Sequence, residues 1–231
     1  MSMNKPKLKV DVISDVVCPW CYIGKRRLEK AIEELKDSLD IEVHYHPFEL
    51  NTAIPQKGYD HKMYLSEKFG GEERYEQLTD QVTSVAAQEG LRFDYSIQNK
   101  LPNTFDIHRI IWFAAKEGKQ LQLVEAFFKA YFEKGIDLTL HENLVAIASS
   151  NGLDAIKTWE LLKGDMGKEE VRAREVVNGK IGVTGVPFYI INDKYAVSGA
   201  QPAEVFIEAL PDIASKEFAD GASCDIEGEN C

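Results

Sequence analysis

Cys18-Pro19-Trp20-Cys21 places two thiols with two residues between them, the spacing of a reactive dithiol. A strand is predicted over Leu8–Ser14 and a helix from Pro19 to about Ser38, so the motif lies at a strand–helix junction. A Cys18 thiolate would lie at the first helical turn, where unpaired backbone N–H groups stabilise negative charge. We therefore expect Cys18 to be solvent-accessible with a pKa below that of free cysteine, and Cys21 to be shielded. One turn further along, Cys21 is close enough to attack a mixed disulfide at Cys18.

The same spacing is also half of a zinc site, which needs two further ligands. Cys224 and Cys231 are too far apart for a second ligand pair, and no histidine pair follows Cys21 at zinc-finger spacing. We therefore predict no metal site. The histidines are expected to be ordinary hydrogen-bonded or exposed side chains and not ligands or general bases: His44, His46, His61, His108 and His141.

Composition narrows the classes of partner. The chain has 231 residues, with 27 basic and 38 acidic side chains and a formal net charge of −11. This balance argues against nonspecific binding to nucleic acid or to an anionic membrane. Segment 1–9 has no apolar stretch of a secretion signal, and no run reaches transmembrane length. Four cysteines are too few for a disulfide scaffold, so we expect a soluble, cytoplasmic protein whose oligomeric state stays open.

Hydrophobic periodicity divides the chain into three parts. Strand patterns over Leu8–Ser14 and Ile41–Pro47 flank the first helix, which is typical of two parallel neighbouring strands. Helical spacing then dominates, and strand patterns return after Gly185. We assign 1–54 and 181–211 to an α/β domain, 55–180 to a helical insertion, and 212–231 to an acidic C-terminal tail with a cysteine pair.

The returning strands form the second informative region. Phe188–Ile191 and Tyr195–Ser198 are predicted to be antiparallel and joined by an Asn192-Asp193 turn. A helix should follow from about Pro202 to Leu210, and a mobile tail over Ala219–Cys231. Gly185-Val186-Pro187 stands just before the predicted strand Phe188–Ile191, where a proline alone would indicate only a turn.

Combined with the CPWC motif, this proline resembles the cis-proline loop of the thioredoxin superfamily. Four segments narrow the resemblance to the FrnE-like branch of the DsbA family, which is related to the 2-hydroxychromene-2-carboxylate isomerases and kappa-class glutathione transferases. They are DVVCPWCYIG from Asp15 to Gly24, NTFDIHR from Asn103 to Arg109, VTGVPF from Val183 to Phe188, and SGAQ from Ser198 to Gln201. The resemblance covers about Val10 to Leu210.

The resemblance implies an α/β thioredoxin fold, with a mixed sheet, interrupted by a large all-helical insertion. It implies Cys18 as nucleophile, Cys21 as resolving thiol and a cis bond between Val186 and Pro187. Pro19, Trp20, Val186 and Pro187 would then bind substrate, with the Val186 backbone pairing with an extended segment. His108 belongs to the segment Asn103–Arg109, which would place it near a cleft under the insertion. The same segment is equally well explained by Asn103-Thr104 capping a helix.

The predicted function is a thiol–disulfide oxidoreductase, acting as oxidase, reductase or isomerase on protein or small-thiol disulfides. Trp20 stands where strongly oxidising DsbA members carry histidine, so we expect a less oxidising couple and leave the direction open. No tightly bound cofactor is expected, and glutathione is a candidate co-substrate. One alternative is a glutathione-dependent isomerase or transferase of the kappa type, against which retention of Cys18 and Cys21 argues. The other is a non-enzymatic substrate-binding module.

Cys224 and Cys231 allow two interpretations. One is a pair of exposed thiols without a role, as in many terminal segments. The other is a second redox pair that exchanges electrons with Cys18 and Cys21, since Gly228 would help the short loop close.

Overall fold

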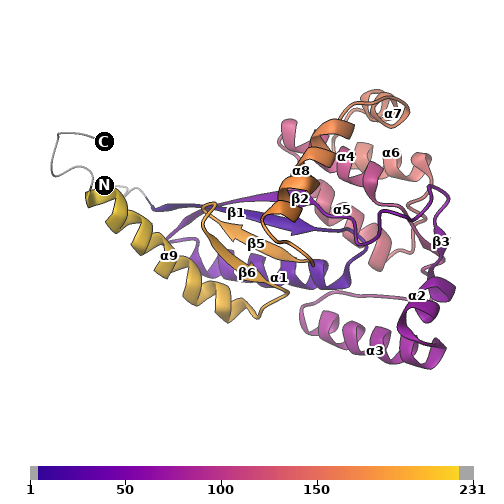
Figure 1. The fold of residues 1–231 in the computed structure, drawn as a ribbon, viewed down its shortest axis with the longest axis horizontal. Helices are drawn as coiled ribbons and strands as arrows, with labels where there is room; N and C mark the ends of the chain where they lie inside the picture. Colours follow the sequence, from indigo (N-terminus) through magenta and orange to yellow (C-terminus); the bar gives the residue numbers. More distant parts are fainter. Residues whose placement is uncertain (1–4, 224–231) are drawn as a thin grey trace.

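A four-stranded mixed sheet forms the centre of the protein (Figure 1), seen in a computed structural model that describes residues 5–223. Its strand order is β2-β1-β5-β6. Strand β1 (Lys7–Ser14) runs parallel to β2 (Asp40–Pro47) and antiparallel to β5 (Phe188–Ile191), which pairs with β6 (Tyr195–Ser198). The predicted parallel pair and the predicted hairpin are both confirmed.

Local sequence explains these strands. The apolar residues of β1 are almost fully buried, as expected of a central strand covered on both faces. Asn192 and Asp193 adopt positive φ angles of 48° and 57°, the left-handed backbone that suits the tight turn between β5 and β6.

Helices cover the sheet from two sides. Helix α1 (Pro19–Leu35) contacts α9 (Ala203–Ser223), and both lie along one side of the sheet in Figure 1. The predicted helix after β6 was expected to end near Leu210, and this boundary is wrong. Its apolar face continues through buried residues spaced at helical intervals, so 212–223 is helical where we predicted a tail: Phe206, Leu210, Ile213 and Ala214.

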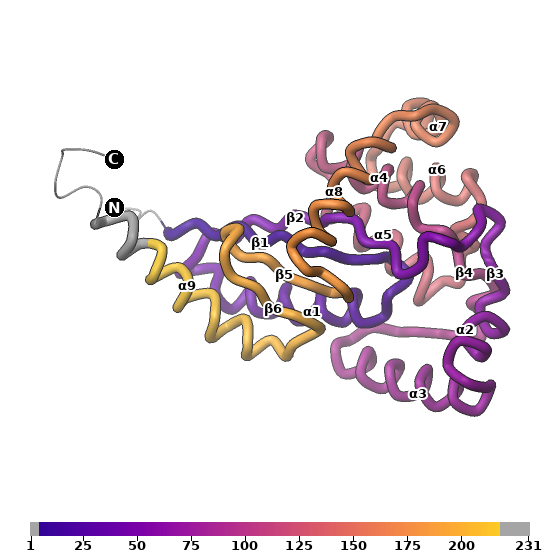
Figure 2. The backbone as a smooth tube through the Cα atoms, viewed as in Figure 1, coloured from indigo at the N-terminus to yellow at the C-terminus, as the bar shows by residue number. Residues whose placement is uncertain are grey.

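Between β2 and β5 the chain leaves the sheet and builds a cluster of helices, as the tube in Figure 2 shows. These helices are α2 (His61–Phe69), α3 (Glu72–Gln88), α4 (Phe105–Lys116), α5 (Gln120–Phe132), α6 (His141–Ser150), α7 (Ala155–Lys163) and α8 (Lys168–Lys180). The insertion is not entirely helical, because β3 (Tyr59–Asp60) pairs with β4 (Lys100–Leu101). Over residues 5–223, no helix has both the length and the apolar character needed to cross a membrane.

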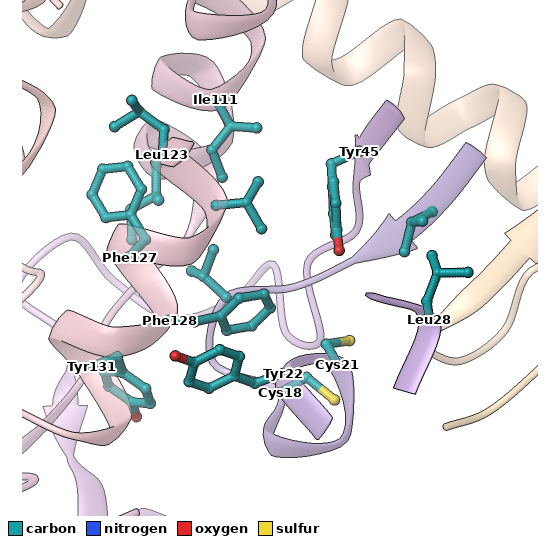
Figure 3. Close-up of a cluster of buried hydrophobic side chains, with 14 of the residues drawn as sticks. Cys18, Cys21, Tyr22, Leu28, Tyr45, Ile111, Leu123, Phe127, Phe128 and Tyr131 are labelled. Atoms are coloured by element: carbon teal, nitrogen blue, oxygen red, sulfur yellow. The ribbon is translucent and has the colours of Figure 1, made fainter. Parts of the chain in front are cut away.

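Aromatic packing joins the insertion to the first helix. Tyr22 of α1 is fully buried, and its ring stacks on Phe128 of α5 with centroids 4.8 Å apart (Figure 3). Phe93 stacks on the same tyrosine at 5.8 Å and on Phe132 at 4.5 Å. Such pairs add roughly 0.5–1.5 kcal/mol each beyond their buried area.

An ionic cluster at Glu125 of α5 strengthens this junction. The Tyr22 hydroxyl donates to Glu125 over 2.8 Å, and the buried Lys25 ammonium lies 2.7 Å from the same carboxylate. Arg26 is a third partner. Burial disfavours the charged carboxylate, but the hydrogen bonds from Arg26 and Lys25 outweigh it and lower the pKa of Glu125 to about 2.

This cluster predicts an acid-sensitive contribution to stability. The folded pKa of Glu125 lies below its ordinary value of 4.5, so its stabilisation is complete above pH 4.5 and is lost as the pH falls toward 2. Glu125→Gln should lower the free energy of unfolding at pH 7 by at most roughly 3 kcal/mol and flatten its decline in this acidic window. Denaturant unfolding from pH 7 to pH 2 measures both effects. Glu142→Gln, at an exposed position on α6, is the control, and an acid profile of Glu125→Gln that matches this control would contradict the prediction.

Candidate active site

The two cysteines occupy the start of α1, directly after β1. Cys18 is the N-cap residue with an extended backbone, and Pro19 fills the first helical position, where its missing N–H costs nothing. The Cys18 carbonyl accepts from the Cys21 amide over 3.0 Å, which closes the first turn. Both thiols are free, and Figure 3 shows the two sulfurs at the same end of the helix.

Cys18 was predicted to be solvent-accessible, and this prediction is wrong because the residue is almost fully buried. Cys18 is 4% exposed and Cys21 is 2% exposed, because the loop before β5 lies over the first cysteine. The Cys18 Sγ lies 3.6 Å from the Val186 carbonyl oxygen. The two thiols nevertheless differ in position, since Cys18 lines a large cleft and Cys21 does not.

Burial also sets the protonation of the second thiol. It raises the pKa of Cys21 well above the ordinary value, and the neighbouring Cys18 raises it further. A hydrogen bond with the Ser14 side chain and one with the Asp15 backbone oppose the rise in part. Cys21 is therefore a protonated thiol in the reduced protein at neutral pH.

The loop before β5 brings the second predicted motif to the cysteines. The Val186–Pro187 peptide bond is cis, and the Pro187 carbonyl accepts from the Gly199 amide over 2.9 Å. Pro187 also contacts α1, where a Cβ added to Gly24 would lie 3.1 Å from its Cγ. Of the predicted substrate-binding residues, Pro19, Trp20 and Val186 line the cleft, whereas Pro187 does not.

The cleft, which we call the substrate cleft, has a volume of about 420 Å³ and lies between the start of α1 and the insertion. Its walls are mainly apolar and aromatic, and Trp20, Leu50 and Phe69 are partly exposed at it. Lys68 is the one lysine or arginine among its lining residues in the described chain. This volume and lining suit a small organic molecule or a short peptide segment.

His61 forms part of the cleft wall, a role that the sequence did not suggest. Its Nδ1 lies 3.3 Å from the Tyr75 hydroxyl, and its ring contacts Tyr95 and Tyr131. Burial lowers the pKa of His61 to about 4 against the opposing charge of Asp60, so the ring is neutral at pH 7. The only sequence signal was its position at the start of α2.

His108 lines a cavity beneath helices of the insertion, as predicted, although this is not the substrate cleft. It does not line the substrate cleft but a second cavity, because α4 turns it toward the sheet end. Its Nε2 lies 3.1 Å from the Phe48 carbonyl oxygen and 3.5 Å from an Asp15 carboxylate oxygen. Burial would lower the pKa of His108, but Asp15 together with Glu175 and Glu49 raises it. Thr104 caps α4 only by position, and Asn103 instead accepts from the Phe105 amide over 3.0 Å.

Other predicted residues are apart from this site. His44 lies 3.1 Å from Glu42, His46 lies 2.8 Å from Asp11, and His141 lies 3.3 Å from Asp106. Cys224 and Cys231 lie outside the described residues. Within the described part of the chain, no three His, Cys, Asp or Glu side chains are arranged as a metal site.

The fold and dithiol define the class to which this protein is assigned. The chain belongs to the DSBA-like thioredoxin domain family, whose family model matches residues 9–211. The match confirms the DsbA family and the thioredoxin fold with an inserted helical region, which the motifs had indicated.

Particular relatives support the same assignment. A probable DsbA oxidoreductase from Streptomyces coelicolor is 34% identical and has a TM-score of 0.83, with 91% of each chain covered. The protein YwbO of Bacillus subtilis is 25% identical over 90% of this chain and 98% of its own. The cytosolic disulfide reductase DsbM from Pseudomonas aeruginosa, solved with GSH, is 14% identical with a TM-score of 0.63, over 88% of this chain and 98% of its own, and shows the same fold.

The positions of the thiols predict an order of alkylation. Limited iodoacetamide treatment of the reduced protein at pH 7 should label Cys18 before Cys21, because Cys18 lines the cleft and the buried Cys21 keeps its proton. Peptide mapping by mass spectrometry measures the order. Predominant labelling of Cys21 would overturn the assignment of the two thiols.

The contact at Gly24 makes a second prediction. A Cβ there would lie 2.3 Å from the hydroxyl oxygen of the buried Tyr189, so Gly24→Ala should destabilise the fold by roughly 1–3 kcal/mol through overpacking. Adding Tyr189→Phe should restore part of the loss, since the displaced oxygen has no hydrogen-bond partner. Thermal unfolding measures each variant. Gly179→Ala in α8 is the control, because a Cβ added there meets no atom within 4 Å outside its own helix, so this variant should not destabilise the fold. Equal effects of the two alanine substitutions would contradict the steric explanation.

Proposed function

We propose that this protein is a thiol–disulfide oxidoreductase that uses Cys18 and Cys21. The observation that carries the proposal is that Cys18 faces the substrate cleft while Cys21 lies one turn behind it, outside the cleft. In the reaction, the Cys18 thiolate attacks a substrate disulfide, forms a mixed disulfide and releases one substrate thiol. Cys21 then attacks Cys18, the enzyme disulfide forms and the second substrate thiol leaves. The reverse sequence reduces the enzyme and oxidises a substrate dithiol.

The surroundings of Cys18 indicate how substrate is held. The Val186 carbonyl lies 3.6 Å from the Cys18 Sγ, so a segment that pairs with the Val186 backbone would place its sulfur beside the nucleophile. The apolar walls favour disulfides that carry apolar groups over strongly charged ones. Both protein and small-thiol disulfides fit this description, and glutathione is included as a co-substrate to be tested.

The direction follows from the residues between the cysteines. Trp20 offers no positive charge to the Cys18 thiolate, so we infer a couple that is less oxidising than that of DsbA members with histidine at this place. We propose that the protein works in the cytoplasm, where thiols are kept reduced, and that it acts there mainly as a reductase or isomerase. The name of the cytosolic relative DsbM supports this proposal.

Turnover of a disulfide substrate is the direct test. With dithiothreitol as reductant and insulin as substrate, the protein should accelerate disulfide reduction. Cys18→Ser should fall to the uncatalysed rate because the nucleophile is lost, and Cys21→Ser should accumulate mixed disulfides because the resolving thiol is lost. Absorbance from insulin precipitation and intact-protein mass spectrometry measure the two effects.

The controls separate the alternatives. Cys224→Ser/Cys231→Ser should keep its turnover if the tail pair has no role, and should lose part of it if that pair exchanges electrons with Cys18 and Cys21. Binding of reduced insulin chains without turnover would favour a binding module. Activity only on glutathione adducts, with none on insulin or glutathione disulfide, would favour the kappa-type alternative.

A further inference from the structure

A second cavity lies behind the dithiol. This back cavity has a volume of about 270 Å³ and is formed by the ends of β1 and β2 together with α4, α5 and α8. Its lining includes Ser14, Tyr45, His46, His108, Glu170 and Arg174. No residue of the described chain lines both the back cavity and the substrate cleft.

The separation arises where β1 ends. Ser14 and Val16 line the back cavity, whereas Asp15 and Val17 line the substrate cleft. The chain turns here, with the Cys18 amide donating to the Asp15 carbonyl over 3.0 Å, and this short segment forms a wall between the two spaces.

Two hydroxyl-bearing side chains that line the back cavity interact with Cys21. Its thiol is hydrogen-bonded to the Ser14 side chain, and the Tyr45 phenol is among the groups that interact with it electrostatically. Figure 3 shows the hydroxyl end of Tyr45 directed toward the cysteine pair. Ser14 and Tyr45 both line the back cavity, whereas Cys21 lines neither space itself.

The resolving step needs such a connection. In the mixed disulfide the substrate occupies the cleft beside Cys18, so less of the cleft is open to water when Cys21 reacts. Cys21 attacks as a thiolate, and its thiol must first release a proton from a buried position. A cavity of this volume is large enough to admit water.

We propose that Ser14 and Tyr45 link Cys21 to the back cavity, and that the Cys21 proton leaves through this cavity during resolution of the mixed disulfide. The Cys21 thiol gives its proton to the Ser14 oxygen while the Ser14 hydroxyl gives its own proton to water in the cavity, and the re-formed hydroxyl then donates to the Cys21 thiolate. The thiolate then attacks Sγ of Cys18, the new Cys18–Cys21 bond forms, and the substrate sulfur leaves with the electron pair. Electrons thus move on the cleft side and the proton on the opposite side. The inference rests on the proposed function.

The groups around Cys21 are compatible with this role. Burial raises the pKa of Tyr45 well above the ordinary range, and Tyr189 of β5 is likewise shifted upward by burial, so both phenols stay neutral. Cys18 on α1 and the Asp15 backbone complete the immediate contacts. The ionisable groups farther along the cavity are His46 paired with Asp11, His108 paired with Asp15, His44 beside Glu42, and the lining side chains of Glu170 and Arg174.

A disulfide that reports each step separately tests the proposal. 4,4′-Dithiodipyridine should release one thiopyridone when Cys18 attacks and a second when Cys21 resolves the mixed disulfide. Stopped-flow absorbance resolves the two phases, and a Cys224→Ser/Cys231→Ser background removes the other thiols. If this parent releases only one thiopyridone per dithiol, the proposed function fails, independently of the proton route.

Ser14→Ala is the main variant. A hydrogen bond to a charged group is lost, so the second phase should slow roughly tenfold and its pH midpoint should rise, while the first phase changes less than about twofold. Ser14→Thr keeps the hydroxyl and should restore the second phase. Tyr45→Phe should slow the same phase. Equal slowing of both phases, or an unchanged second phase, would overturn the role of these hydroxyls.

Narrowing the cavity tests the route itself. Ala115 lines the back cavity at an exposed position of α4, and Ala115→Phe should slow the second phase only. Ala146→Phe, at an exposed position of α6 away from both spaces, is the matched control and should leave both phases unchanged. Thermal unfolding verifies that the variants are folded. A second phase of Ala115→Phe that matches the control would show that the proton leaves elsewhere.

Discussion

The close approach of helix α1 to strand β5 is the constraint on which the site depends. At Gly24 there is no room for a side chain between the helix, the Tyr189 hydroxyl and the Pro187 ring. This contact brings the Val186 carbonyl to 3.6 Å from the Cys18 Sγ and thereby forms one side of the substrate cleft. The reactivity of the dithiol is therefore a property of three segments that lie far apart in the sequence, and not of the CPWC motif alone.

The opposite side of α1 is held by different forces. Tyr22 and Lys25 extend from the helix into the insertion, where one stacks on Phe128 and both contact Glu125. The apolar contact supplies burial, whereas the ion cluster satisfies charges that would otherwise be buried without partners. Because Tyr22 directly follows Cys21, the forces that fix the insertion also fix the first turn of the helix that carries the thiols.

Parts of this arrangement could be read from the sequence because their determinants are local. The CPWC motif at a strand–helix junction, the Asn192-Asp193 turn and the parallel β1–β2 pair each depend on short patterns. The shielding of Cys18 depends on a contact across 168 positions in sequence, which periodicity does not encode. His61 gave no signal because its neutrality arises from burial beside tyrosines that lie elsewhere in the sequence.

Two further differences have the same kind of cause. Helix α9 was predicted to end near Leu210 because the acidic composition beyond it outweighed the spacing of Ile213 and Ala214, which continue its buried face. The two spaces lie on either side of residues 14–17, where the chain turns from β1 into α1. The strand–helix junction could be predicted from the sequence, but the cavities that its side chains line depend on helices of the insertion.

The junction at Tyr22 also bears on how the protein can be divided. The insertion is a continuous stretch of chain and resembles a separable module on a diagram of the sequence. Its aromatic core, however, includes a ring that belongs to α1, and its Glu125 is neutralised by cations of the same helix. Excising the insertion would expose the Tyr22 ring and leave the α1 cations without their carboxylate partner. The excised helices would lose the Tyr22 ring from their core and the cations that pair with Glu125. The contiguous segment that forms the insertion is therefore not a complete cooperative folding unit in this protein. Exchanging the insertion between relatives would require α1 to be exchanged with it.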